Sequence, residues 1–235
     1  MAIDRALVDQ AAREGTVVHR LYAWAADTIS LGANEAARRT WDRAALERAQ
    51  LPVVRRPTGG RGVWHDRTDL TYAVTGPVAV FGDLRRAYRV IHERLAAALQ
   101  DIGLDTTLAS PASRRATLGP GACFDRPVGG EVLVANRKMI GSAQAVFGAN
   151  LLQHGAIARA DRRHSLARFR LVAAEDSPRP DGIEFPLADE LAEAILGAWE
   201  ADGASPAPSW LVDWAETASR DYQARFDDPE WTWRR

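Results

Sequence analysis

Two residues that occur once each in this chain could do covalent chemistry together. Of the 30 basic side chains 29 are arginine and one is lysine, Lys138, and the single cysteine, Cys123, lies fifteen positions earlier. The arginine side chain ends in a planar guanidinium that is permanently charged. The lysine side chain ends in a compact ammonium that can approach one atom closely and change its protonation state. Lys138 is therefore a candidate for chemistry. The alternative is that composition bias left it on a solvated strand edge.

Cys123 lies in the segment GPGACFDRP, whose glycines and prolines are typical of a loop. A cysteine on a loop is more often exposed, and an exposed thiol beside a cation is nucleophilic. With an ordinary pKa of about 8.5, roughly 3% of a thiol is thiolate at pH 7. Lowering the pKa to about 7 raises this to about 50% and needs roughly 2 kcal/mol, which one ammonium can supply. The alternative is that Cys123 is a small buried hydrophobic residue.

Two further clusters of residues could line a ligand. In RRPTGGRGVWHD, residues 55–66, glycines permit close approach to the backbone beside several arginines. The segment is neither a Walker loop nor a dinucleotide fingerprint, and its alternative role is a structural turn between strands. In GSAQ and LLQHG, small residues next to Lys138 permit close approach to a strand, and His154 is either aimed inward or a satisfied structural histidine. The candidate binding residues are Arg56, Thr58, Gly59, Gly60, Arg61, Gly62, His65, Gly141, Ser142, Ala143, Gln144, His154 and Gly155.

The elements that would position these residues alternate irregularly. Hydrophobic periodicity predicts helices over 3–14, 43–49, 84–101 and 187–199, and strands over 17–24, 28–31, 53–55, 70–74, 131–135, 138–144 and in LLQHGAIA. Residues 55–66 are predicted to form a Gly-rich loop, 136–137 a turn, and 176–186 a Pro-rich loop. The strict βαβ rhythm of a doubly wound sheet is missing. The pattern favours the α+β class, a mixed, largely antiparallel sheet flanked by helices.

Composition excludes several classes of function. At 235 residues, 46% of them hydrophobic, the chain is long enough for a sizeable core, and a net charge of −1 gives no basic field for nucleic acid. The sequence lacks the apolar run of a secretory signal or a membrane span, so a cytoplasmic protein is expected. One cysteine cannot form an internal disulfide or supply the thiolates of a zinc cluster.

Three ordered motifs, RRPTGGRGVWHD, RKMIGSAQ and LLQHG, resemble the biotin/lipoate protein ligase and transferase superfamily. Its members carry an Arg-Arg-x-Thr-Gly-Gly loop, an Arg-Lys-x-x-Gly-Ser-Ala strand and a Gln-His-Gly strand in this order, and the resemblance covers about residues 1–199. TGGR and CFDRP look most like the ligase-like octanoyltransferase branch of that superfamily. Departures from the branch are Val128, where serine is common, and Asn136, where glycine is usual.

The resemblance implies a biotin/lipoate ligase-like fold with one catalytic domain over 1–235, its C-terminal tail of about 205–235 packing back on the rest. It implies that Cys123 accepts an octanoyl group from octanoyl-acyl carrier protein as a thioester and that Lys138 lowers the pKa of this cysteine. A lysine of a lipoyl domain or of a glycine-cleavage H-type protein would then receive the group. Backbone N–H groups near 141–143 would stabilise the oxyanion. Neither ATP nor a metal is implied, because the thioester already carries the activation.

Three alternatives stay open at this point. An ATP-dependent lipoate or octanoate ligase would use Lys138 to bind an acyl phosphate and would leave Cys123 incidental. An octanoyl amidotransferase would use the same cysteine but take its acyl group from another lipoyl domain. A non-catalytic module would merely bind the acyl chain.

Overall fold

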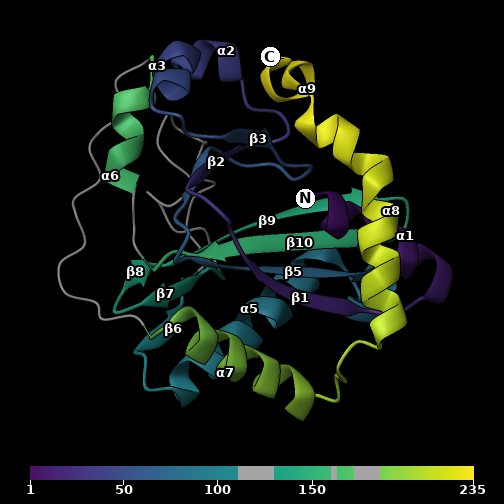
Figure 1. The fold of residues 1–235 in the computed structure, drawn as a ribbon. Helices are drawn as coiled ribbons and strands as arrows, with labels where there is room; N and C mark the ends of the chain where they lie inside the picture. Colours follow the sequence, from purple (N-terminus) through teal and green to yellow (C-terminus); the bar gives the residue numbers. More distant parts are fainter. Residues whose placement is uncertain (111–129, 160–162, 172–185) are drawn as a thin grey trace.

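The computed structural model describes residues 1–110, 130–159, 163–171 and 186–235, and Figure 1 shows its ribbon. The helices are α1 (Ala2–Glu14), α2 (Ala37–Thr40), α3 (Arg43–Arg48), α4 (Val78–Phe81), α5 (Leu84–Asp101), α6 (Arg163–Leu166), α7 (Ala188–Ala201), α8 (Ser209–Asp227) and α9 (Pro229–Trp233), with a 3-10 turn at Ala167–Phe169. The strands are β1 (Val18–Ala23), β2 (Thr28–Leu31), β3 (Val53–Arg55), β4 (Val63–His65), β5 (Leu70–Pro77), β6 (Thr106–Leu108), β7 (Val132–Val134), β8 (Arg137–Lys138), β9 (Ile140–Phe147) and β10 (Asn150–Ile157).

A four-stranded antiparallel sheet in the order β1-β5-β10-β9 runs through the middle of the molecule (Figure 1). Its register places Gly155 of β10 opposite Tyr72 of β5 and Ser142 of β9. Successive side chains of a strand point to opposite faces. Tyr72 accordingly joins the core formed with α5 and α7, whereas its neighbour Ala73 packs with Val8 of α1 on the other face.

Helix α5 covers one face of this sheet because its apolar side chains recur at helical spacing. The carboxylate of Asp83 caps the first turn by accepting a hydrogen bond from the N–H of Arg86 at 2.8 Å. Ile91 and Leu95 are at most 2% exposed and pack against the sheet. The same helix buries His92 completely, so this polar side chain must find hydrogen-bond partners inside the protein.

A second, three-stranded sheet in the order β3-β2-β4 lies over the first one, with α2 and α3 beyond it (Figure 1). Strands β2 and β3 are parallel, and β2 and β4 are antiparallel. The prediction of a continuous loop over 55–66 is wrong for Val63–His65, which pair with β2 as β4. The Gly-rich segment is therefore the connection between two strands of one sheet. Gly62 packs against the buried Trp41, since a Cβ there would lie 2.2 Å from the indole ring.

A third small sheet, β6-β7-β8, positions the segment that carries Lys138. Val134 pairs with Arg137, so the two residues of the turn are Ala135 and Asn136, with φ of 46° and 60°. The predicted turn at 136–137 is wrong by one residue. A two-residue hairpin turn requires positive φ at both positions, which asparagine tolerates better than most residues. This explains why Asn136 can stand where related sequences usually have glycine.

Two helices form most of the C-terminal segment of about 205–235, for which no helix was predicted. Helix α8 lies along α1, and α9 returns to the second sheet beside α2 and β3 (Figure 1). Trp233 of α9 is 7% exposed and belongs to the core of the second sheet. The buried guanidinium of Arg55 donates to the carbonyls of Thr232 at 2.9 Å and Gly32 at 2.6 Å. Its charge-assisted hydrogen bonds anchor α9 to the β3 end of the loop.

The periodicity predictions agree well with these elements. The predicted helices 3–14 and 84–101 and the predicted strands 28–31 and 53–55 coincide with α1, α5, β2 and β3 within one residue. The α+β class with a mixed, largely antiparallel sheet is confirmed. The predicted loop over 176–186 lies, except for its last residue, outside the described residues. Among the helices that the structure describes, none has the length and apolar character needed to cross a membrane.

Substitution of single glycines gives a direct test of the close approach between the end of β2 and the Gly-rich loop. A Cβ on Gly32 would lie 1.9 Å from the carbonyl oxygen of Gly60, whereas the exposed helical Gly197 has open space around its Cα. We expect Gly32→Ala to lower the free energy of unfolding by about 2 kcal/mol or more, because backbone must move. Gly197→Ala should raise it by about 0.5–1 kcal/mol.

Urea denaturation of both variants measures this difference. An unchanged midpoint in Gly32→Ala would contradict the described contact between β2 and the Gly-rich loop. Gly197→Ala serves as the matched control, since it introduces the same methyl group without a collision.

Candidate active site

The Gly-rich loop is held in shape by a buried guanidinium. Arg56 is 4% exposed and donates from Nη1 to the carbonyl of Ser30 at 2.8 Å. Its Nη2 donates to the carbonyls of Gly59 and Arg61, both at 2.8 Å. These hydrogen bonds fold the loop around the side chain and satisfy carbonyls that would otherwise be buried without partners. Arg56 therefore shapes the loop that was predicted to bind substrate.

A buried Asp–His–Thr chain joins this loop to the central sheet. His154 Nε2 lies 2.6 Å from Thr58 Oγ1, and its Nδ1 lies 3.3 Å from a carboxylate oxygen of Asp4. All three side chains are at most 4% exposed. Because the carboxylate accepts from Nδ1, Nε2 is the acceptor for the Thr58 hydroxyl. Both nitrogens of His154 have partners, which fits the structural alternative for this residue.

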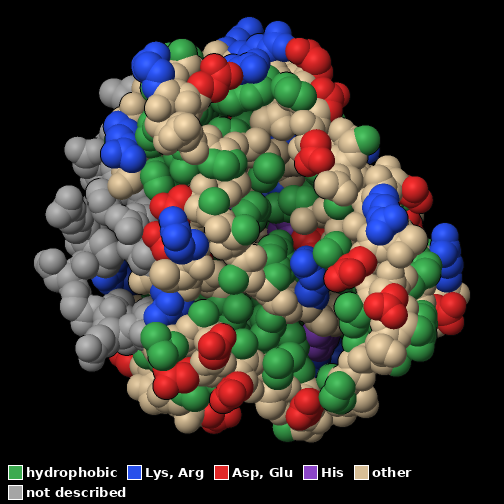
Figure 2. Space-filling model, viewed as in Figure 1, with side chains coloured by type: hydrophobic (Ala, Val, Ile, Leu, Met, Phe, Trp, Pro, Cys, Tyr) green, Lys and Arg blue, Asp and Glu red, His purple; other side chains and the backbone are tan. Residues whose placement is uncertain are grey.

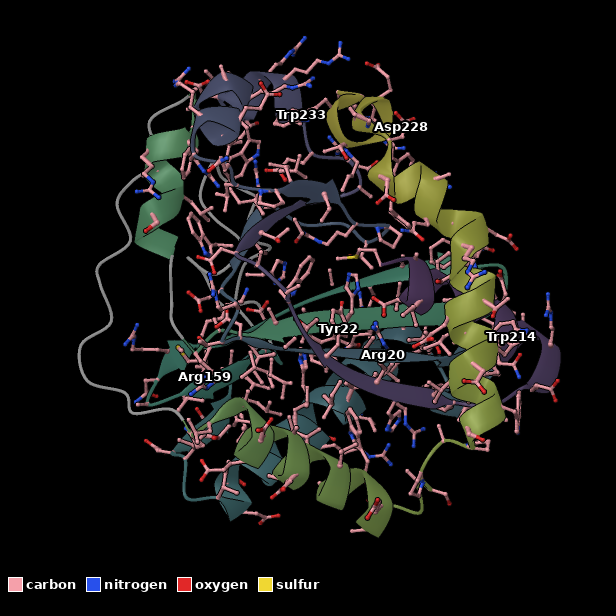
Figure 3. The ribbon with its side chains drawn as sticks, in the orientation of Figure 1. Arg20, Tyr22, Arg159, Trp214, Asp228 and Trp233 are labelled. Carbon is pink, nitrogen blue, oxygen red and sulfur yellow. The ribbon has the colours of Figure 1, made fainter. Side chains whose placement is uncertain are left out.

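Asp4 is a site residue that sequence reasoning missed. Its carboxylate also accepts hydrogen bonds from Arg20 Nη1 at 2.5 Å and Tyr22 Oη at 3.3 Å, both projecting from β1 (Figure 3). Burial by itself raises the pKa of Asp4, but the amino group of Met1, the hydrogen bond from His154 and the charge of Arg20 outweigh it and hold this pKa well below its ordinary value. An aspartate in the first turn of an amphipathic helix looks like an ordinary solvated charge. Its partners come from β1 and β10, which periodicity cannot reveal.

A pocket opens between the two sheets above this chain, with about 350 Å³ of empty space that is partly open to solvent. In the view of Figure 2, histidine side chains are visible at the bottom of hollows in the surface. Seven of the predicted binding residues line the pocket, namely Arg56, His65, Gly141, Ser142, Ala143, His154 and Gly155. The structure thus brings together residues from three separate sequence motifs.

His65 contributes an imidazole to the pocket wall. Its Nε2 lies 2.7 Å from Ser30 Oγ, and its ring stacks on Trp24 with centroids 4.3 Å apart. Burial first, and then the charge of Arg56, lowers the pKa of His65 well below its ordinary value. Within the described part of the chain its Nδ1 is buried without a hydrogen-bond partner. A buried nitrogen of this kind is suited to a hydrogen bond with a bound molecule.

The remaining predicted binding residues lie around the pocket without lining it. Thr58, Gly59, Gly60, Arg61 and Gly62 belong to the loop itself, where Gly60 has a φ of 96°. Gln144 is directed toward α5, donating to the carbonyl of Leu84 at 3.1 Å and to Gln153 Oε1 at 2.9 Å.

A second polar cluster lies where the sheet meets α5. Ser142 Oγ is 2.6 Å from Tyr72 Oη and 2.8 Å from His92 Nε2, and His92 Nδ1 is 2.7 Å from the carbonyl of Gly130. Burial, the largest effect, and the charge of Lys138 lower the pKa of His92 to about 4, against the opposing effect of the hydrogen bond that the ring donates to the carbonyl of Gly130. His92 is therefore neutral at physiological pH. Sequence analysis missed it, because a single histidine in an apolar helix stripe carries no motif.

Lys138 is buried in an ion pair. Its Nζ lies 2.7 Å from Oε1 of Glu131, and both residues are at most 5% exposed. The alternative of a leftover lysine on a solvated strand edge is therefore wrong. Tyr88 Oη donates to the same carboxylate oxygen at 3.4 Å. Glu131 is a further residue that the sequence analysis missed, although it lies on the same hairpin as Lys138.

Cys123 lies outside the described residues, and so does the rest of its CFDRP motif. In the described ranges, no group of three His, Cys, Asp or Glu side chains is arranged to hold a metal ion.

This fold and site define a family. The model of the lipoyl protein ligase A/B catalytic domain matches residues 1–179, which is most of the chain. The chain belongs to this family.

Individual relatives are consistent with one branch of it. The chain is 33% identical to the octanoyltransferase LipM of Kyrpidia tusciae over 258 residues, covering 100% of this chain and 94% of that protein. It is 38% identical to the octanoyltransferase LipM of Carboxydothermus hydrogenoformans over 161 residues, which are 67% of this chain but 59% of that protein. Among solved structures, the protein Ta0514 of T. acidophilum, described as a putative lipoate protein ligase, aligns over 100% of this chain and 92% of its own with a TM-score of 0.77. At 18% identity that likeness shows the fold alone.

The lowered pKa of His92 predicts how stability depends on pH. Between about pH 6.5 and pH 4 the unfolded chain binds a proton that the folded His92 does not bind, so stability falls as pH falls through this window and then levels off. This residue alone accounts for a loss of about 3 kcal/mol. The lowered pKa values of His19, His65 and His154 act in the same direction.

Urea unfolding at several pH values from about 7 to 4 measures the loss, and His92→Gln should show a shallower dependence by about one proton. Identical slopes in the wild-type protein and the variant would contradict a neutral buried His92.

Proposed function

We propose that this protein is an octanoyltransferase that moves an octanoyl group from a carrier-protein thioester to a lysine of a lipoyl-type domain. Family membership supports acyl chemistry on lipoyl proteins, and both relatives described above are named octanoyltransferases. The observation that carries the proposal furthest is the burial of the chain's single lysine in an ion pair with Glu131. The donor, octanoyl-acyl carrier protein, and an H-type acceptor protein are the more detailed parts of the proposal.

The proposed mechanism has two steps. The thiolate of Cys123 attacks the carbonyl carbon of the donor thioester, and the carrier's sulfur leaves as a thiolate, which gives an octanoyl-Cys123 enzyme. The amine of the acceptor lysine then attacks this second thioester, the C–N bond forms and the C–S bond breaks. ATP has no role in either step, because the first step exchanges one thioester for another and the second uses the activated thioester to form an amide.

Lys138 acts in this proposal through its charge. A buried ammonium favours the thiolate over the thiol and can attract the developing oxyanion, and Glu131 holds the ammonium in one position. Backbone N–H groups at 141–143 are further candidates for the oxyanion. They lie on β9, an edge strand of the central sheet, where alternate N–H groups point away from β10.

We also propose that residues 1–235 work as one catalytic domain, with 205–235 as its C-terminal part. The packing of α8 on α1 and the anchoring of α9 by Arg55 support this. An ATP-dependent ligase remains the second candidate function, because the family model includes ligases.

The first prediction from this mechanism concerns Cys123. Cys123→Ala should abolish transfer of the octanoyl group from octanoyl carrier protein to a lipoyl domain, because the variant lacks the thiolate that would form the acyl-enzyme. Mass spectrometry of the lipoyl domain measures the transfer. Undiminished transfer by the variant, or transfer that needs ATP and free octanoate, would support the ligase instead.

The second prediction concerns Lys138. Lys138→Arg should slow formation of the acyl-enzyme by about a hundredfold or more, because the planar guanidinium of arginine does not fit the compact buried site that the lysine ammonium occupies beside Glu131. Rapid-quench measurement of the acyl-enzyme gives the rate, and circular dichroism checks that the variant is folded. Rates close to those of the wild-type protein would remove Lys138 from the mechanism.

A further inference from the structure

The hydrogen bonds around Ser142 fix the direction in which its hydroxyl proton points. The carbonyl of Gly130 can only accept, so His92 Nδ1 carries the proton of the neutral ring and Nε2 carries a lone pair. Ser142 Oγ lies 2.8 Å from Nε2 and must donate to it. Tyr72 Oη, which accepts from Gln153 Nε2 at 2.9 Å, then donates to Ser142 Oγ at 2.6 Å.

In the resulting chain of hydrogen bonds, Ser142 Oγ can form one more hydrogen bond, and only as an acceptor. Its proton is used toward His92 and one lone pair is used by Tyr72, so the remaining lone pair can only accept. Gly155 allows β10 to pack closely against Ser142, since a Cβ there would lie 2.6 Å from Ser142 Oγ. Ser142 and Gly155 both line the pocket between the sheets.

A group that only accepts discriminates between the two nucleophiles of the proposed reaction. The incoming lysine amine carries N–H bonds that need an acceptor, whereas a thiolate carries none. We propose that Ser142 Oγ accepts a hydrogen bond from an N–H of the attacking amine and that His92 is the positioning residue that makes Ser142 an acceptor. This inference rests on the proposed function, because it assigns a partner for the acceptor lysine in the second step.

The step balances without a further reactant. The amine nitrogen forms a bond to the carbonyl carbon of octanoyl-Cys123, and the sulfur leaves with the electrons of the C–S bond. The nitrogen loses one proton, which ends on the departing sulfur. Ser142 orients the nitrogen lone pair toward the carbonyl by holding an N–H on the opposite side, which is a contribution of orientation.

The experiment separates three rates in each variant. The first rate is acylation of the protein by octanoyl carrier protein, the second is transfer from the acyl-enzyme to a lipoyl domain, and the third is transfer to the small thiol 2-mercaptoethanol. Ser142→Ala and His92→Phe should slow transfer to the lipoyl domain about tenfold or more and leave the other two rates within about twofold. His92→Gln should retain most of the amine transfer, because its carbonyl oxygen can accept from Ser142.

Thr75→Val is the matched control, since it also replaces a buried hydroxyl of the central sheet by a methyl group. Within the described residues the Thr75 hydroxyl has no partner, so all three rates should stay at the wild-type values. Wild-type amine transfer in Ser142→Ala, or equal slowing of all three rates, would overturn the inference. If the wild-type protein instead needs ATP and free octanoate, the proposed function fails, and the ratio of amine to thiol transfer from the acyl-adenylate still decides the role of Ser142.

Discussion

The Asp4–His154–Thr58 chain is the interaction on which the arrangement of the site depends. It connects the first helix, the third strand of the central sheet and the Gly-rich loop through two hydrogen bonds, in a place from which solvent is excluded. A buried carboxylate is tolerated here because Arg20 and His154 share its charge and lone pairs. These contacts tie the connection between β3 and β4 to the central sheet, and the hydrogen bonds of Arg56 hold the same connection against β2.

A second set of buried polar groups lies where the same strands meet α5. The pair of Lys138 and Glu131 lies near the chain that runs from Gln153 through Tyr72 and Ser142 to His92. Polar groups at this depth are costly unless each has its partner, so the geometry of each group is determined by the others. This mutual dependence gives a lysine of fixed position and a serine of fixed hydrogen-bond direction.

Much of this arrangement can be predicted from the sequence. The spacing of apolar residues predicts α1 and α5 closely, and three short motifs contain seven residues of the pocket. What periodicity could not give are contacts between distant segments. Asp4 and His92 lie on well-predicted helices, yet their roles come from β10 and β9, which reach them only in the folded chain. The sequence analysis predicted a tail over about 205–235 but not the helices α8 and α9 within it, because the burial of these helices depends on α1 and Arg55.

The central claim is that one sulfur carries the acyl group between donor and acceptor. The most direct measurement is the intact mass of the wild-type protein after incubation with octanoyl carrier protein in the absence of ATP, followed by peptide mapping of the modified residue. The account predicts a gain of one octanoyl group on Cys123 that disappears when a lipoyl domain is added. An unchanged mass, with modification of the lipoyl domain appearing only after ATP and free octanoate are supplied, would contradict it.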